Sequence, residues 1–148
     1  FKTYIEPHLN EKIQYVGELT EDQLSGFYGP AKALLYPIEW EEPFGLVVTE
    51  AMACGTPVLT SNRSAMREIA EGAALLVDPL SPAAIAEGLR RLATDAALAH
   101  DLVERGLDHA RAYRWEETAC RTLAVYQAAV DRKTGRSPSA VEAALLHS

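Results

Sequence analysis

Three short apolar runs constrain the fold of this chain more strongly than any other feature of its sequence. They lie at residues 33–36, 57–60 and 74–77, and the first and last end directly at Pro37 and Asp78. Each run is nearly continuously apolar rather than alternating, which is typical of strands buried on both faces of a parallel sheet. Segments with helical periodicity separate the runs. This alternation predicts a parallel sheet with helices on both faces.

Local signals mark where the helices begin and end. Thr20 and Gln23 fit a capping box at the start of one helix, which Gly29 ends. Ser81 caps another helix, which has Pro82 at its first position. Further helices are expected over residues 45–54, 64–70, 95–113 and 115–130, the last with Ala119, Leu123, Tyr126 and Val130 on one face.

An additional strand is expected near the start of the chain. Residues 13–16 favour β structure and are stopped by Gly17. Right-handed crossovers between parallel strands reduce the possible topologies to a Rossmann-like layered fold, here followed by a helical C-terminal region. Ligands of such sheets bind beyond the carboxyl ends of the strands. That rule places the loops at residues 37–45 and 60–64 on the candidate binding edge.

The composition excludes several functional classes. The chain has 148 residues, 48% of them hydrophobic and 24% charged, which is ordinary for a globular domain. No apolar run approaches the ~18 residues needed to cross a bilayer. The formal net charge of −7 argues against broad nucleic-acid binding, which needs dense Lys and Arg. Cys54 and Cys120 are too few for a disulfide scaffold. We therefore expect a cytoplasmic protein that does not bind nucleic acid.

The densest chemical signal lies at residues 39–57. Glu42 precedes a predicted helix, and Glu50 follows eight residues later, about two turns along it. The backbone N–H groups of Phe44, Gly45 and Leu46 fall in the first turn, where they have no partner inside the helix. With the helix dipole they form a site for an anion or a hydroxyl. Carboxylates at both ends and donors between them suit a ligand that carries sugar hydroxyls and a diphosphate.

The same residues resemble a known family. Glu42 and Glu50 match the E-x7-E signature of retaining glycosyltransferases of family 4, which have the GT-B fold, and the wording from Pro43 to Pro57 strengthens the match. Other segments that resemble the family lie at residues 15–19, 67–69, 75–79 and 113–116, so the resemblance covers roughly residues 13–130. Arg67 stands where proline is usual in the family.

The resemblance implies a role for each matching residue. Glu42 would be the catalytic residue that contacts the donor sugar at its reacting centre, and Glu50 would accept hydrogen bonds from the ribose. The nucleotide-sugar would bind without a metal or other cofactor. The remaining donor-binding residues would be Phe44, Gly45 and Leu46 through their amides, Val47 near the diphosphate, Gly17 and Glu18 around the base pocket, and Leu19 beside the base.

The chain also departs from the family near its start. Residues 1–12 contain only Lys2 and Lys12 as basic residues and do not match the segment that grips the diphosphate. The resemblance therefore implies an N-terminally truncated donor-binding domain that is inactive alone. The acceptor, and any peripheral membrane contact, would require an absent N-terminal domain. Residues 1–130 would form the partial nucleotide-sugar-binding domain. Residues 131–148 would form a polar linker and a helix that packs on that absent domain.

Several alternatives remain open from the sequence. A non-catalytic module that binds a nucleotide-sugar or a protein partner is the competing functional class. Arg63 and Arg67 could meet phosphate or acceptor, or could pair with Glu68 or Glu71. Glu39, Glu41 and Glu42 could bind a divalent metal ion or form a solvated acidic loop. Trp40 could provide an aromatic surface for a sugar or pack within the loop. Cys54 could be a reactive thiol or a small buried residue.

Overall fold

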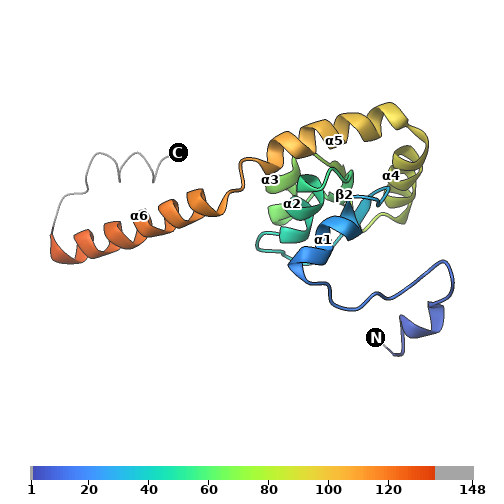
Figure 1. The fold of residues 1–148 in the computed structure, drawn as a ribbon, viewed down its shortest axis with the longest axis horizontal. Helices are drawn as coiled ribbons and strands as arrows, with labels where there is room; N and C mark the ends of the chain where they lie inside the picture. Colours follow the sequence, from blue (N-terminus) through green and yellow to red (C-terminus); the bar gives the residue numbers. More distant parts are fainter. Residues whose placement is uncertain (1, 136–148) are drawn as a thin grey trace.

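The computed structural model describes residues 2–135. Its centre is a parallel three-stranded sheet in the order β1 (Leu34–Tyr36), β2 (Val58–Ser61) and β3 (Leu75–Val77). Leu35 pairs with Leu59, and Leu59 with Leu75. The three predicted strands are thus confirmed to within one residue, together with the α/β fold class (Figure 1).

Helices cover both faces of this sheet. On one face lie α1 (Glu21–Tyr28), α2 (Leu46–Ala53) and α3 (Ser64–Ala70), and on the other lie α4 (Pro82–Thr94) and α5 (Ala96–Ala110). Neighbouring residues of β2 serve the two faces, since Val58 packs with the first group and Leu59 with the second, and both are fully buried. This two-sided burial explains why the runs are continuously apolar.

The later part of α5 crosses back toward α2. Gly106 is buried, and a Cβ built there would lie 3.3 Å from Met52 Cγ. A glycine thus permits the close approach of the two helices. Because of this crossing, the residues that follow α5 lie beside α2, although the two segments are far apart in sequence.

The prediction of a strand at residues 13–16 is wrong. Ile13 makes only an isolated bridge with Asn10, after a short 3-10 helix at Glu6–His8. Ile13, Tyr15 and Val16 are each more than half exposed. A strand needs a neighbouring backbone to pair with, and the sheet of the described residues has β1 rather than this segment at its edge.

The C-terminal region is helical, but it differs from the expectation in two ways. The helix α6 spans Trp115–Thr134 and projects away from the body of the domain (Figure 1). The stripe of Leu123, Tyr126 and Val130 is more than half exposed, because α6 leaves the body and the sheet offers it no face.

The polar linker was expected to begin at residue 131, but residues 131–134 still belong to α6. Arg132 and Lys133 lie in its last turn, where basic side chains complement the helix dipole, and Gly135 ends it in the left-handed conformation. The rest of the expected linker and the C-terminal helix lie outside the described residues. Within residues 2–135, no helix combines the length and the apolar character needed to span a bilayer.

Candidate functional site

Glu42 lies in the loop that leads from β1 to α2, at the carboxyl edge of the sheet. Its Oε2 atom accepts a hydrogen bond from Trp40 Nε1 at 3.0 Å and a longer one from the Tyr36 hydroxyl at 3.4 Å. Its backbone carbonyl accepts from the Ser64 hydroxyl at 3.2 Å. Burial, and then the Glu42 carboxylate, raise the pKa of Tyr36 above its ordinary value. The Tyr36 hydroxyl is therefore a donor at neutral pH.

Gly45 determines how the chain enters α2. It is the N-cap residue, with a left-handed φ of 89°. A Cβ built at this position would overlap the Met66 Cε atom, and Met66 is fully buried. Only glycine meets both conditions. The helix begins at Leu46, so the expectation that the Phe44 amide lies in its first turn is wrong: Phe44 precedes the N-cap. Leu46 and Val47 open the helix, and their amides have no partner inside it.

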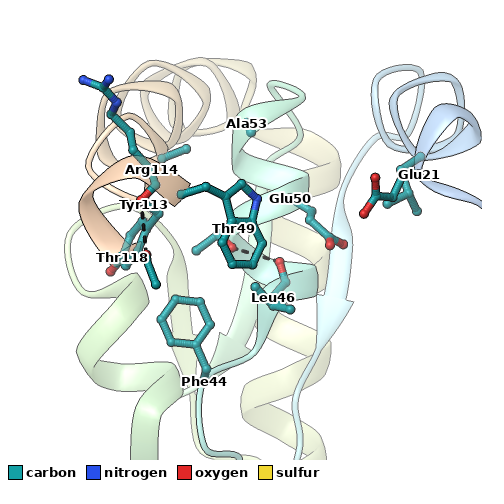
Figure 2. Close-up of a pocket in the computed structure, with 12 residues that line it drawn as sticks. Glu21, Phe44, Leu46, Thr49, Glu50, Ala53, Tyr113, Arg114 and Thr118 are labelled. Carbon is teal, nitrogen blue, oxygen red and sulfur yellow. Dashed lines mark hydrogen bonds between the residues drawn. The ribbon is translucent and has the colours of Figure 1, made fainter. Parts of the chain in front are cut away.

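A cavity of about 700 Å³ lies beside α2. Three parts of the chain form its wall: the start of α1, the outer side of α2 with the preceding Phe44, and the junction between α5 and α6 (Figure 2). The residues that line it are Glu21, Leu24, Phe44, Leu46, Thr49, Glu50, Ala53, Ala110, Tyr113, Arg114, Trp115 and Thr118.

The charges of this cavity are unevenly distributed. Figure 2 shows the carboxylates of Glu21 and Glu50 directed toward each other. Burial, and then the nearby Glu50 carboxylate, raise the pKa of Tyr28, which packs behind α2. Within the described part of the chain, the lining contains one guanidinium, that of Arg114. Arg114 Nε lies 3.6 Å from Glu116 Oε2.

An aromatic contact joins the two sides of the cavity wall. The ring of Tyr113 meets that of Phe44 edge to face, with centroids 5.6 Å apart. The Tyr113 hydroxyl lies 3.3 Å from His109 Nε2, which in turn lies 2.6 Å from the Ile69 carbonyl oxygen. The segment after α5 is thereby tied both to the loop before α2 and to α3.

The structure brings together some of the predicted donor-binding residues. Phe44, Leu46 and Glu50 line the cavity, whereas Glu42 and Gly45 lie at the adjoining loop, and Val47 packs against the core. The residues expected around the base, Gly17, Glu18 and Leu19, precede α1, whose Glu21 lines the cavity.

Sequence reasoning missed the contribution of the α5–α6 junction. Tyr113 and Trp115 belong to a segment that resembles the family. That resemblance pointed to these residues, but it implied no binding role for them. Arg114 lies in the same segment, and Thr118 carried no signal, since only the path of α5 brings it to the cavity.

The structure also bears on the alternatives that the sequence left open. Arg63 pairs with Asp78 at 3.4 Å, and Arg67 pairs with Glu71 at 3.8 Å. Trp40 packs edge to face against Tyr36 and donates to Glu42. Cys54 is half-buried. Across residues 2–135, no three His, Cys, Asp or Glu side chains are placed to share a metal ion.

Comparison with known proteins identifies the family. Residues 2–109 match the family described as glycosyl transferases, group 1. The chain belongs to this family. The group 1 domain is 32% identical over 115 residues to O-antigen chain mannosyltransferase B of Escherichia coli, a match that covers 78% of this chain and 30% of that protein. It is 38% identical over 126 residues to the D-inositol 3-phosphate glycosyltransferase of Arthrobacter sp. strain FB24, covering 84% and 30%.

A solved structure supports the same assignment. Sucrose-phosphate synthase from Thermosynechococcus elongatus superposes on the group 1 domain with a TM-score of 0.75 and 32% identity, covering 84% of this chain and 32% of that one. The parallel sheet flanked by helices is thus that of a GT-B fold. The chain spans about 30% of the length of the curated relatives that it matches.

Proposed function

We propose that this domain binds the nucleotide-sugar donor of a retaining family 4 glycosyltransferase, which transfers the sugar to an acceptor with retention of the anomeric configuration. One observation carries the proposal: Glu50 and the first residue of α2, Leu46, line the same cavity of about 700 Å³. A cavity of that size accommodates a small-molecule ligand. Membership of the glycosyl transferase family supports this occupant.

The spacing along α2 suits such a donor. Leu46 and Glu50 are four residues apart, a rise of about 6 Å along the helix axis. In our proposal, the ribose hydroxyls donate to Glu50, the diphosphate lies against the amides of Leu46 and Val47, and the sugar extends toward Glu42. Charge that develops on the departing diphosphate is then stabilised by the positive end of the helix dipole.

We further propose that the chain alone transfers no sugar. Within the described residues the cavity lining has two carboxylates and one guanidinium, which is a weak match for a diphosphate. The acceptor would be held by another part of a longer protein, and no metal would be required. The expected result is no turnover of UDP-glucose or GDP-mannose by this chain, with or without EDTA. Measurable turnover would contradict the proposal.

The weak match to a diphosphate also supports a second candidate function, a non-catalytic module that binds a nucleotide-sugar or a protein partner, because such a module has no departing diphosphate to stabilise. The two candidates differ in what a longer protein containing this domain would do. A transferase would lose far more turnover than donor affinity on Glu42→Gln. A binding module would show no turnover to lose.

Ligand titration tests the ribose assignment. NMR titration of the chain with UDP and GDP should show weak binding, and Glu50→Ala should lower the affinity about threefold to tenfold, the value of one to two hydrogen bonds. The 2′-deoxy nucleotides should respond less to the same change. Glu87→Ala is the matched control, because Glu87 is an exposed residue of α4 that pairs with Arg90. Equal effects of the two changes would refute the ribose assignment.

A further inference from the structure

The carboxylate of Glu42 is held by one of its oxygens. Trp40 Nε1 and the Tyr36 hydroxyl both donate to Oε2, at 3.0 and 3.4 Å. Within the described residues no hydrogen bond reaches Oε1. Hydrogen bonds to an ionised group are stronger than those between neutral groups. The pair of donors therefore fixes the rotation of the carboxylate and leaves Oε1 to accept from a ligand.

The two donors also support each other. Tyr36 is the last residue of β1, so the sheet fixes its position, whereas Trp40 lies on the loop and is 59% exposed. The rings meet edge to face, with centroids 6.1 Å apart and planes at 89°. This arrangement is favourable for aromatic pairs. It gives a packing partner to an indole that is otherwise mostly in solvent.

The backbone of Glu42 is fixed as well. The Ser64 hydroxyl donates to its carbonyl oxygen at 3.2 Å. Ser64 begins α3 and has a φ of 50°, the one left-handed non-glycine residue of the described chain. Such strain persists only where the surroundings impose it, and it clusters at functional sites. Side chain and backbone of Glu42 are thus restrained by three different parts of the chain.

We propose that Trp40 and Tyr36 are positioning residues that orient the Glu42 carboxylate, so that Oε1 accepts a hydrogen bond from a hydroxyl of the donor sugar. The inference rests on the proposed function, because it takes the sugar of a nucleotide-sugar as the ligand of Glu42. It adds two residues outside the E-x7-E pair to the sugar subsite. Trp40 acts here through its N–H group rather than as a stacking surface.

The indole N–H provides a direct test on the 148-residue chain. The sequence has two tryptophans, so the ¹H–¹⁵N spectrum has two indole signals, and the one that disappears in Trp40→Phe belongs to Trp40. Glu42→Gln should move the Trp40 signal upfield, because an amide oxygen is a weaker acceptor than a carboxylate. An unchanged Trp40 signal in Glu42→Gln would overturn the proposal.

Titration with matched ligands tests the role toward the sugar. UDP-glucose and GDP-mannose should shift the Trp40 indole signal, whereas UDP and GDP, which lack the sugar, should not. Trp40→Phe and Tyr36→Phe should each weaken binding of the sugar nucleotide about threefold to tenfold and change binding of the free diphosphate less than about twofold. In the Glu42→Gln background, Trp40→Phe should have no further effect. Tyr126→Phe, on the exposed side of α6, is the control for loss of a phenol hydroxyl.

The outcomes separate this inference from the proposed function. If all four ligands shift resonances near Glu50 but the sugar nucleotides leave the Trp40 indole unmoved, the positioning role is wrong and the donor site remains. The same holds if Trp40→Phe weakens free and sugar-bearing nucleotides equally, as a purely structural role would. If no ligand shifts any resonance of the chain at millimolar concentration, the proposed function of this chain fails, and the positioning role fails with it.

Discussion

Phe44 and Tyr113 pack edge to face, with ring centroids 5.6 Å apart and planes at 81°. Phe44 lies just before α2, and Tyr113 just after α5, so the contact joins two segments that are distant in sequence. His109 extends the link to α3 through the Ile69 carbonyl oxygen. The wall of the cavity is therefore fixed by tertiary contacts on the side that the E-x7-E segment does not supply.

This contact should be measurable as a coupling energy. Tyr113→Leu and Phe44→Leu should each destabilise the domain, and a double-mutant cycle in urea should give about 0.5–1.5 kcal/mol of interaction between the two rings. Phe44→Leu combined with Tyr126→Leu is the control. Tyr126 is 66% exposed on α6, so these two changes should be additive within about 0.5 kcal/mol. Additivity of the Phe44 and Tyr113 changes would show that the rings do not interact.

Gly45 and Gly72 provide a matched pair for the entry into α2. Both have a positive φ, of 89° and 83°. A Cβ at Gly72 meets nothing within 4 Å, whereas one at Gly45 overlaps Met66 Cε and lies 3.0 Å from its Sδ. Gly72→Ala should therefore cost only the backbone strain, about 1–2 kcal/mol of unfolding free energy. Gly45→Ala should cost about 1–3 kcal/mol more, because the buried Met66 must move. Equal losses in urea unfolding would contradict this account.

The sequence predicts the central part of the fold well because each signal there is local. The runs of β1 to β3 are buried on both sides, so their apolar character is continuous. The capping residue Ser81 accepts from the Ala84 amide, as expected from a short pattern. The run at residues 13–16 has the same local character, but strand formation also depends on a neighbouring backbone, which sequence alone does not place.

The part of the candidate site that lies in one short segment was also predictable from the sequence. Phe44, Leu46 and Glu50 belong to one short segment, and all three line the cavity. Tyr36 and Trp40 both precede that segment, and their convergence on Glu42 depends on how the loop folds back toward the end of β1. The exposure of the α6 stripe was not predictable, since periodicity shows that residues share a face and not what covers it.

The pH dependence of stability should report on Glu50. Burial, and then Glu50, raise the pKa of Tyr28 above its ordinary value of 10.0. Near and above that pH the unfolded chain loses the phenol proton more readily than the folded one, so the unfolding free energy should fall as the pH rises through about 10 and beyond. Tyr28→Phe should reduce this fall.

In Glu50→Gln, the Tyr28 phenol should ionise at a lower pH than in the unchanged chain, although burial keeps its pKa raised. NMR of the assigned Tyr28 ring measures this, and an unchanged titration would show that Glu50 does not act on it.

Arg114 should contribute binding energy without contributing stability. Its side chain is 67% exposed and lies 3.6 Å from Glu116, and an exposed ion pair of this kind contributes little to folding. Because Arg114 also lines the cavity, Arg114→Gln should weaken UDP binding about twofold to fivefold at low salt. The difference should disappear at about 0.5 M salt, where the Debye length is only a few ångströms.

Glu116→Gln should have the opposite effect on UDP binding, since it releases the Arg114 guanidinium. Arg111→Gln is the matched control: Arg111 pairs with Asp108 and does not line the cavity. If the Arg111 and Arg114 variants bind UDP equally at low salt, the phosphates do not lie at this side of the cavity.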